Sequence, residues 1–224
     1  MPKKLAYLHT VTSLVGLFTD LSKQLLPPDV EIFHMADELL LKTALAQGGL
    51  SPFLYRRVAD NVRAAEEAGA DAVQVTCSSI GPCVDMARTL VNIPVLRVDE
   101  PMVRQAISLG RRIGVAATAT TTLKPTVDLV REQARLADRE VTVEAVLCEG
   151  AYAALFGGRP EEHDRIVREY LQALAGRVDV ILLAQASMAR VADSLPPDPK
   201  RVPILASPRL AVERARDVLA QVQK

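Results

Sequence analysis

A cysteine among hydroxyl-bearing residues is the part of this sequence best suited to chemistry. Cys77 lies in the run TCSSIGP at residues 76–82, directly after an apolar stretch. Gly81 permits a tight turn and Pro82 suits the first turn of a helix, whose free N–H groups lower the pKa of a nearby thiol and favour the thiolate. We therefore expect Cys77 to act as a general base or nucleophile. The neighbouring hydroxyl groups expected to hold a carboxylate are those of Thr76, Ser78 and Ser79.

Hydroxyl groups recur in the run ATATTT at residues 117–122. Helix capping is the alternative role for any one of them, but four threonines in five positions exceed what one cap needs. We expect Thr118, Thr121 and Thr122 to grip a carboxylate with hydroxyl and amide groups. His9 and Thr10 close the first apolar run and are expected to reach the same site.

The bulk composition narrows the class of protein. The chain has 224 residues, 49% of them hydrophobic, with 27 Lys plus Arg against 27 Asp plus Glu. A net charge of zero offers no field to attract nucleic acid or an anionic membrane. No signal peptide or run long enough to span a bilayer is found, so we expect a cytoplasmic protein with no membrane partner. The sequence has neither GxGxxG, GxxxxGK[ST] nor GxSxG.

The other two cysteines are expected to be structural. Cys77, Cys83 and Cys148 are odd in number and fit neither a disulfide framework nor a common zinc spacing. We expect Cys83 and Cys148 to be small buried hydrophobes. With no ligand cluster, phosphate loop or lysine in the strand-end motifs, we expect no metal, nucleotide or pyridoxal phosphate.

Apolar runs alternate with helical patterns along the chain, which predicts an α/β fold with parallel sheets covered on both faces. The expected strands are residues 4–10, 30–36, 72–77, 94–99, 112–118, 141–148, 178–185 and 202–206. The expected helices are residues 54–68, 123–137, 161–175 and 208–222, with a further helix ending near residue 110 and a Pro-rich surface loop at 195–203.

The alternation of apolar strands and helices in the first half of the chain is repeated in the second half. The strand that ends in Thr76-Cys77-Ser78 has a counterpart that ends in Gln185-Ala186-Ser187. We therefore expect two pseudo-symmetric lobes, each a short parallel sheet flanked by helices. Lobe 1 would comprise residues 1–98 plus 207–224, and lobe 2 residues 99–206. Because ligands bind at the carboxyl ends of parallel strands, the active site is expected in a cleft between the lobes.

These motifs resemble those of the aspartate/glutamate/hydantoin racemase superfamily over nearly the whole chain. The resemblance rests on LHT at 8–10, TCSSIGP at 76–82, RVDEPM at 97–102, IGVAATATTTLKPT at 113–126, LLAQASMA at 182–189 and VPILASP at 202–208. It implies cofactor-independent isomerase chemistry, racemisation or epimerisation, at the carbon next to a small carboxylate. In the superfamily's racemases one cysteine stands on each side of that carbon, and hydrogen-bond donors hold the enolate.

Cys77 matches the first catalytic cysteine of the superfamily, whereas Gln185 stands at the place of the second. A glutamine neither takes nor gives a proton near pH 7. Three readings stay open: a racemase in which His9 or water is the second acid; a one-cysteine isomerase of maleate type or malonate decarboxylase; and a non-catalytic carboxylate binder. Ser187 is expected to line the wall beside Gln185. Asp37, Glu38, Asp99 and Glu100 are either solvated loop and cap charges or site residues, and a homo-oligomer is plausible.

Overall fold

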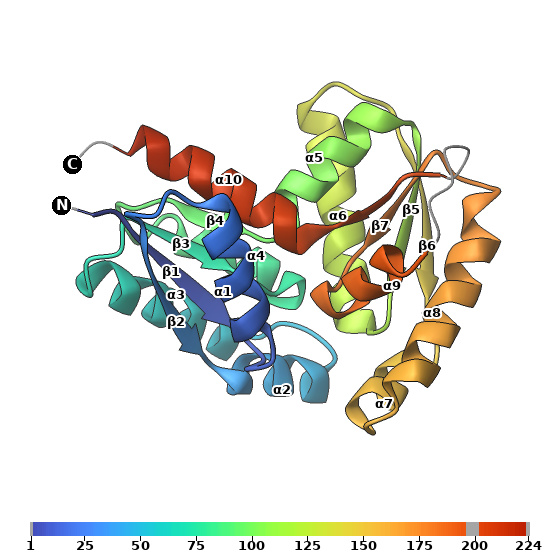
Figure 1. Cartoon of the computed structure of the whole chain (residues 1–224), viewed down its shortest axis with the longest axis horizontal. Helices are drawn as coiled ribbons and strands as arrows, with labels where there is room; N and C mark the ends of the chain where they lie inside the picture. Colours follow the sequence, from blue (N-terminus) through green and yellow to red (C-terminus); the bar gives the residue numbers. More distant parts are fainter. Residues whose placement is uncertain (1, 196–201, 223–224) are drawn as a thin grey trace. The chain divides into compact units, whose positions relative to one another are not determined.

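The computed structural model describes residues 2–195 and 202–222, so six residues of the expected Pro-rich loop lie outside the described part. The chain divides into two units, Met1–Val98 with Pro208–Lys224, and Asp99–Ser207. Each unit contains a four-stranded parallel sheet flanked by helices (Figure 1). The expected α/β class with two helix-covered parallel sheets is confirmed.

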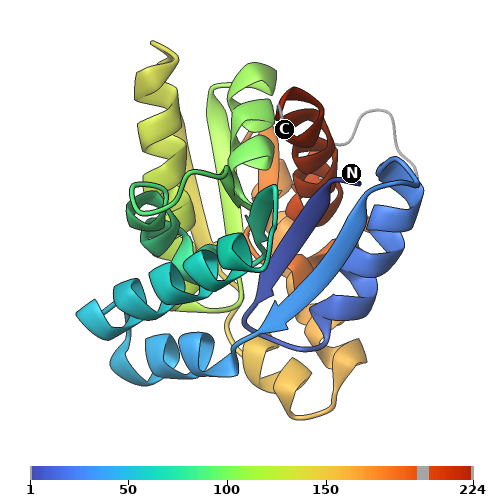
Figure 2. The same cartoon turned by 90° about the vertical axis from the view of Figure 1, so that its left-hand side faces the viewer.

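The first unit has the strand order β2-β1-β3-β4, with every pair parallel. Its strands are β1 (Lys4–His9), β2 (Glu31–Ala36), β3 (Ala72–Val75) and β4 (Val95–Arg97). Its helices are α1 (Leu14–Leu25), α2 (Glu38–Gln47), α3 (Pro52–Glu67), the 3-10 turn η1 (Ser78–Ile80), α4 (Gly81–Ala87) and α10 (Ser207–Gln221). Figure 2 shows β1 and β2, in blue, side by side.

Alternation along β1 decides what covers each face of this sheet, because successive side chains of a strand point to opposite sides. Ala6 and Leu8 belong to a buried cluster with Val58 and Val62 of α3. Leu5 and Tyr7 belong to another, which contains Phe18 of α1 and a row of α10 residues. The row consists of Ala211, Val212, Ala215 and Leu219. Both faces of the sheet are therefore buried, as a parallel sheet requires.

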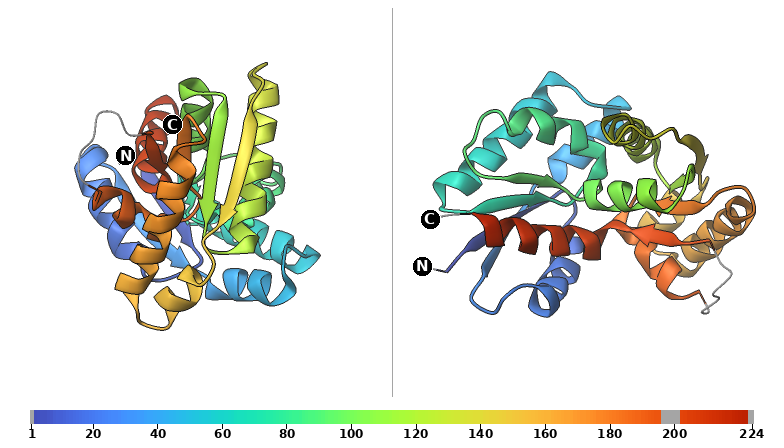
Figure 3. Two further views of the ribbon diagram at one scale, coloured as in Figure 1. Left: turned by 90° about the vertical axis from the view of Figure 1, so that its right-hand side faces the viewer. Right: turned by 90° about the horizontal axis from the view of Figure 1, so that it is seen from above.

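The second unit repeats the strand order as β6-β5-β7-β8, again all parallel (Figure 3, left). Its strands are β5 (Arg112–Ala117), β6 (Thr142–Leu147), β7 (Val180–Leu183) and β8 (Ile204–Ala206). Its helices are α5 (Glu100–Leu109), α6 (Thr120–Leu136), α7 (Ala151–Phe156), α8 (Pro160–Ala175), the 3-10 turn η2 (Ala186–Met188) and α9 (Ala189–Asp193).

A glycine permits close helix packing in this second sheet. A Cβ atom added at Gly114 of β5 would lie 2.7 Å from Cδ2 of Leu174, a buried residue of α8. Leu174 shares a cluster with Val167 and Ile181, which places α8 against the centre of the sheet. The helices α5 and α6 also pack against this sheet, α5 on β7 and α6 on β5 and β6. A larger residue at 114 would push α8 away from β5.

Candidate active site

Cys77 lies just beyond the carboxyl end of β3, in extended backbone with φ −129° and ψ 118°. The 3-10 turn η1 follows at once and leads into α4, in which Pro82 occupies the first turn. Of the three cysteines, Cys77 alone is partly exposed, whereas Cys83 and Cys148 have no exposed surface and lie in hydrophobic clusters. Burial raises the pKa of each of these two thiols to about 12, which fits the structural role expected of them.

Four hydrogen bonds converge on the sulfur of Cys77. They come from the hydroxyl of Thr10, the N–H and hydroxyl of Ser79 and the N–H of Ile80, and each of them lowers the pKa of the thiol. Burial nevertheless outweighs them, so that the pKa of Cys77 is raised. The sequence-based expectation of a lowered pKa is therefore wrong for the resting protein. The turn supplies the expected N–H donors, but the sulfur is desolvated more than these donors can offset.

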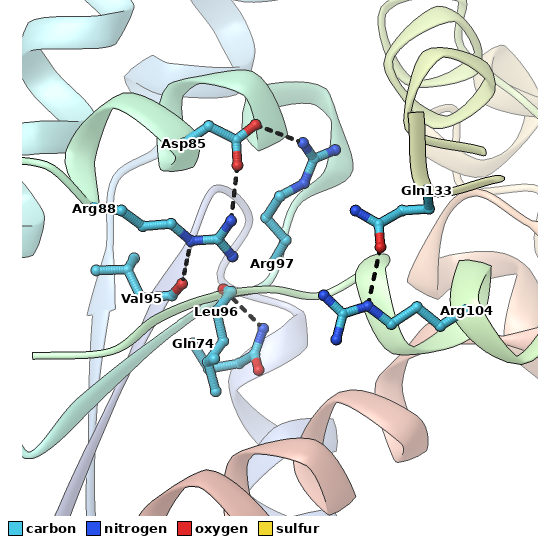
Figure 4. A network of polar contacts seen from close by, with 8 residues as sticks. All are labelled: Gln74, Asp85, Arg88, Val95, Leu96, Arg97, Arg104 and Gln133. Atoms are coloured by element: carbon cyan, nitrogen blue, oxygen red, sulfur yellow. Dashed lines mark hydrogen bonds and ion pairs between the residues drawn. The ribbon is translucent and has the colours of Figure 1, made fainter. Parts of the chain in front are cut away.

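A buried arginine supports the turn that carries Cys77. Arg97, at the end of β4, is 4% exposed, and its guanidinium lies 3.0 Å from Oδ2 of Asp85 in α4. A Cβ atom at Gly81 would overlap this guanidinium, so α4 begins on a glycine. Asp85 also accepts a hydrogen bond of 2.9 Å from Arg88, whose Nε donates to the carbonyl of Val95 (Figure 4). These contacts tie α4 to β4.

The second unit places Gln185 where the first unit has Cys77. Leu8 pairs with Val75 in the first sheet, and Ala116 pairs with Leu183 in the second. Counting two residues on from Val75 and Leu183 makes Cys77 and Gln185 equivalent. The backbone agrees, since Gln185 has φ −129° and ψ 137° and precedes η2 as Cys77 precedes η1.

The side chain of Gln185 is held by Thr118, which follows β5. The N–H and the hydroxyl of Thr118 donate to Oε1 of Gln185 over 2.5 and 2.9 Å. Because both partners are donors, the amide oxygen must face Thr118 and the NH₂ group points elsewhere. The hydroxyl of Thr118 is thereby committed to Gln185.

The amino terminus of α6 carries two more of the expected residues. Thr121 and Thr122 lie in its first turn and are 8% and 3% exposed. The hydroxyl of Thr121 is buried without a hydrogen-bond partner, which costs free energy unless a ligand accepts or donates there. The N–H groups of Thr122 and Leu123 donate to the carbonyl of Ala119, whereas N–H groups that precede them at a helix start lack intrahelical acceptors and favour an anion. This helix start therefore has the donors that a carboxylate needs.

His9 and Thr76 are hydrogen-bonded to each other at the carboxyl ends of β1 and β3. Nδ1 of His9 lies 2.9 Å from Oγ1 of Thr76, and Nε2 of His9 lies 2.8 Å from Nδ1 of His34. The hydroxyl of Thr76 also lies 3.2 Å from the carbonyl oxygen of Leu8. Both ring nitrogens of His9 are thus engaged within the unit, and His9 has no exposed surface. Neither nitrogen is open to a substrate.

The remaining predicted residues divide between the site and the scaffold. Ser78 and Ser79 are buried in η1, and Ser187 is partly exposed in η2. Asp37 accepts a hydrogen bond of 2.6 Å from Arg57 and serves the scaffold. Glu38 is paired with Lys42 one turn on. The two acidic residues at the start of α5 are Asp99, which is buried, and Glu100.

Sequence reasoning missed the roles of His34 and Arg97. His34 contacts His9 because Tyr7 and His34 are register partners on β1 and β2, and a pairing register is not visible in the sequence. The one available signal for Arg97 was a charged residue at the end of an apolar strand, followed by an acidic pair. A charged side chain is buried only when it has an ion-pair partner and enough space. For Arg97, Asp85 is the partner and Gly81 leaves the space.

A groove of about 660 Å³ lies elsewhere on the second unit. Five arginines line it: Arg111, Arg112, Arg131, Arg135 and Arg139. Arg112 and Thr142, which also lines it, begin β5 and β6, so the groove lies at the amino ends of the strands. It is therefore separate from Thr118 and Gln185 at the carboxyl ends. Within residues 2–195 and 202–222, no group of His, Cys, Asp or Glu is arranged to hold a metal ion, and no helix could span a membrane.

Residues 25–215 match the sequence model of the Asp/Glu/Hydantoin racemase family. The chain belongs to this family. An uncharacterised protein of Schizosaccharomyces pombe is 28% identical over 130 residues, which are 57% of this chain and 54% of that protein. The chain thus matches about half the length of this curated relative.

Solved structures agree with the family assignment in their fold. An allantoin racemase from Klebsiella pneumoniae has a TM-score of 0.70 at 18% identity, covering 98% of this chain and 88% of that one. A glutamate racemase from Francisella tularensis, in complex with D-glutamate, has a TM-score of 0.72 at 16% identity, covering 98% and 82%. The chain therefore has the two-lobed fold of these racemases.

Proposed function

We propose that this racemase-family protein is a cofactor-independent isomerase that racemises or epimerises a small carboxylate through Cys77. The observation that carries the proposal is the setting of this thiol. It lies at the carboxyl end of a central strand, is partly exposed, and receives hydrogen bonds from Thr10, Ser79 and Ile80. A sulfur that only filled space in the core would need no such donors, as Cys148 illustrates within a hydrophobic cluster.

The proposed chemistry is proton transfer at the carbon next to the carboxylate. Donors around Cys77 stabilise the thiolate that removes the proton, while its desolvation makes that thiolate a stronger base. The start of α6, with the unpartnered hydroxyl of Thr121, supplies donors for carboxylate or enolate oxygens. Ser78, Thr122 and Ser187 are proposed to assist with hydroxyl groups. Thr118 is proposed to position Gln185, and the buried His9 and Thr76 are proposed to support the strand ends rather than to contact the substrate.

A one-cysteine reaction is the second candidate, and the state of Gln185 favours it. The oxygen of Gln185 is occupied by Thr118, and its NH₂ group donates hydrogen bonds but does not transfer protons near pH 7. The raised pKa of Cys77 also keeps this residue a thiol at neutral pH, which suits delivery of a proton. Cis–trans isomerisation of a maleate-like diacid, or decarboxylation of a malonate, would need one thiol alone.

The test is proton NMR in D₂O with aspartate, glutamate, a hydantoin, maleate and an aryl malonate, each with wild type and with Cys77→Ser. We expect Cys77→Ser to lower turnover by about 10²-fold or more, the usual contribution of an acid–base group. Cys83→Ala is the matched control, because it removes a thiol from the core of the same unit and should retain activity.

Each outcome selects one function. Deuterium that enters the α-position together with inversion, in wild type alone, supports racemisation. Fumarate from maleate, or loss of CO₂ from the malonate, selects the one-cysteine reaction. No reaction across the panel, with Cys77 unreactive toward iodoacetamide, would leave a carboxylate-binding protein. Equal loss in Cys77→Ser and Cys83→Ala would overturn the assignment of Cys77.

A further inference from the structure

The groove on the second unit lies at the amino ends of β5 and β6, whereas Thr118 and Gln185 follow the carboxyl ends of β5 and β7. Its volume of about 660 Å³ falls within the usual range for sites of small ligands, about 300–1,000 Å³. The lining comes from the last turns of α6, residues 139–141, and the starts of β5 and β6, against which α6 packs (Figure 3, left). We call it the arginine groove, after Arg111, Arg112, Arg131, Arg135 and Arg139.

The arginine groove carries positive charge that its own residues do not neutralise. Arg112 is bound by Asp179, whose Oδ1 lies 2.7 and 2.9 Å from two nitrogens of the guanidinium. The other four arginines are exposed and form no ion pair with any described residue. Among the described residues that line the groove, Glu140 alone is acidic. Four guanidinium groups are therefore available to an anion from solution.

The helix end explains only part of this charge. The carboxyl end of α6 favours a nearby cation, which accounts for Arg135 in its last turn. It does not account for Arg131, which lies one turn earlier and places a like charge four residues from Arg135, a slightly destabilising arrangement. Nor does it account for Arg111, which reaches the groove from the start of β5. The arginines thus converge on the groove from separate segments.

Asp179 fixes the backbone of the two arginines at the start of β5. Its Oδ2 accepts hydrogen bonds from the N–H groups of Arg111 and Arg112 over 3.0 and 2.8 Å. Backbone and side-chain hydrogen bonds from Arg112 lower the pKa of Asp179 to about 2, so this carboxylate stays ionised. A Cβ atom at Gly110 would overlap that of Asp179, so a glycine lets the chain pass this close. The N–H of Thr142 donates to the carbonyl of Arg111 over 2.8 Å and brings the start of β6 to the same place.

The first unit has the same backbone arrangement with its charges paired. Register makes three pairs of residues equivalent: Lys4 and Arg112, Asp71 and Asp179, Glu31 and Thr142. Asp71 accepts the N–H of Lys4 over 2.7 Å, as Asp179 accepts that of Arg112. Glu31 lies 3.6 Å from Nζ of Lys4, but the threonine at its place in the second unit has no charge. The fold therefore forms with this corner neutral, and the unpaired arginines are not needed to build it.

The chemistry of the lining points to phosphate. Guanidinium groups bind phosphate through paired, charge-assisted hydrogen bonds, and a terminal phosphate offers three acceptor oxygens. None of the described residues that line the groove is aromatic, so no ring is available for a nucleobase to stack on. We propose that the arginine groove is a further binding site, for a small anion that carries several phosphate groups. One such ligand binds guanidinium groups of α6 and of the β5 start together.

The first test is isothermal titration calorimetry of the full chain with sodium tripolyphosphate, without any substrate. We expect saturable binding that weakens by about tenfold in Arg131→Gln and in Arg135→Gln, the contribution of one charge-assisted hydrogen bond. Arg165→Gln is the matched control, because it removes the same charge from α8 of the same unit, where Arg165 is paired with Glu169. Absence of saturable binding, or equal weakening in the control, would overturn the proposal.

The second test gives the second unit the acidic residue of the first. Thr142→Glu places a carboxylate at the position equivalent to Glu31, and Thr142→Gln places an uncharged group of the same size there. We expect Thr142→Glu to weaken tripolyphosphate binding by about tenfold or more, because a negative charge in the groove competes with the anion. Thr142→Gln should stay within about twofold of wild type, a small fraction of a tenfold change in affinity. The same affinity in both variants would contradict the assignment of the site to this groove.

Three further probes define the ligand. Citrate carries a similar charge on carboxylates, and citrate that binds as tightly as tripolyphosphate would overturn the choice of phosphate. Binding of single-stranded RNA without binding of tripolyphosphate would overturn the choice of a small ligand. A lipid headgroup shares the phosphate chemistry, so phosphatidylcholine vesicles are tested with and without phosphatidylinositol bisphosphate. Sedimentation of the tripolyphosphate-binding protein with the second kind alone assigns the site to a headgroup, and no sedimentation assigns it to a free oligophosphate.

This inference goes beyond the proposed function and stands apart from it. None of these experiments measures isomerisation, so a protein that is inactive on the substrate panel can still bind tripolyphosphate. Conversely, an active isomerase that binds no tripolyphosphate would retain the proposed function and lose the arginine groove as a site.

Discussion

In the first unit the hydroxyl of Thr10 donates to the sulfur of Cys77, and in the second unit the hydroxyl of Thr118 donates to the amide oxygen of Gln185. These are equivalent pairs of residues, set by the same strand order and the same register. The threonine donor is common to both units, whereas its acceptor differs. Both units therefore place a threonine hydroxyl next to the residue that follows the central strand, but only the first unit has a thiol there.

The two units also differ at the edge strand and at the helix that follows Cys77 or Gln185. Arg97 of the first unit corresponds to Ala206 of the second, and Gly81 corresponds to Ala189. The first unit therefore has an arginine packed on a glycine where the second has two alanines. The turn at Cys77 therefore has a buried ion-paired arginine behind it that the turn at Gln185 lacks, which suits the precise positioning that the proposed proton transfer would need.

Among the changes that test this comparison of the two units, the largest effect is expected from placing a cysteine at both strand ends. Gln185→Cys places a thiol where Thr118 can donate to it, as Thr10 donates to Cys77. We expect the rate of inversion of a bound α-substituted acid to rise by about tenfold or more, because a positioned acid–base group contributes 10²–10⁴-fold when its geometry is good. Deuterium exchange together with chiral chromatography measures this.

Gln185→Ser is the control for that change, since it is small and hydroxylated but does not shuttle protons near neutral pH. An equal gain in both variants would attribute the effect to the space created. No gain in Gln185→Cys, with a substrate shown to bind, would count against Gln185 as the site of the missing thiol.

A smaller effect, on stability, is expected from the arginine and glycine pair. Gly81→Ala forces a methyl group into the guanidinium of Arg97 and should lower the free energy of unfolding by about 1–3 kcal/mol. Gly81→Ala combined with Arg97→Ala reproduces the alanine pair of the second unit. We expect its loss to be smaller than the sum of the two single losses, because the clash is absent. Urea unfolding measures all three variants.

Gly16→Ala is the matched control for the unfolding series. Gly16 lies inside α1, and no atom lies within 4 Å of an added Cβ there. Alanine favours helix over glycine, so this variant should be as stable as wild type or more stable. An equal loss at both glycines would contradict the account of Gly81.

The smallest effect is expected at Thr10. Its hydroxyl lowers the pKa of Cys77, so Thr10→Val should raise that pKa further and reduce the thiolate fraction at any pH below it. The rate of alkylation by iodoacetamide at pH 7 should fall by about two- to fivefold, with an inflection moved to higher pH. Thr118→Val is the control, since its hydroxyl serves Gln185. A rate that does not move in Thr10→Val would exclude its hydrogen bond to the sulfur.

Much of the fold could be predicted from the sequence because buried parallel strands are continuous apolar runs. All eight expected strands are present. Each is shorter than its apolar run, because residues at one or both ends of the run do not pair with a neighbouring strand. The helices α1, α2, α7 and α9 were not predicted. The helix α1 has a regular apolar stripe that the sequence reasoning missed, formed by Leu14, Phe18, Leu21 and Leu25. By contrast, α2 buries only Leu40 and Ala44, so it has little apolar face to recognise.

Site residues that lie together in one continuous sequence motif could be predicted. Contacts that depend on how two strands align could not. Cys77 and the threonines at the start of α6 lie in continuous motifs at strand ends. The partnership of His9 with His34 joins residues from neighbouring strands, and it arises from the alignment of β1 with β2. The pKa of Cys77 was misjudged for a related reason, because helix starts are visible in a sequence but the depth of burial is not.

The helix α10 has a consequence for how the protein is made. Its residues Ala211, Val212 and Ala215 complete the cluster around Leu5 and Tyr7, although they follow the whole second unit in the chain. A growing polypeptide therefore finishes the uninterrupted unit Asp99–Ser207 before the sheet that carries Cys77 receives its last helix. Until α10 has been synthesised, the face of the first sheet that carries Leu5 and Tyr7 lacks part of its cover.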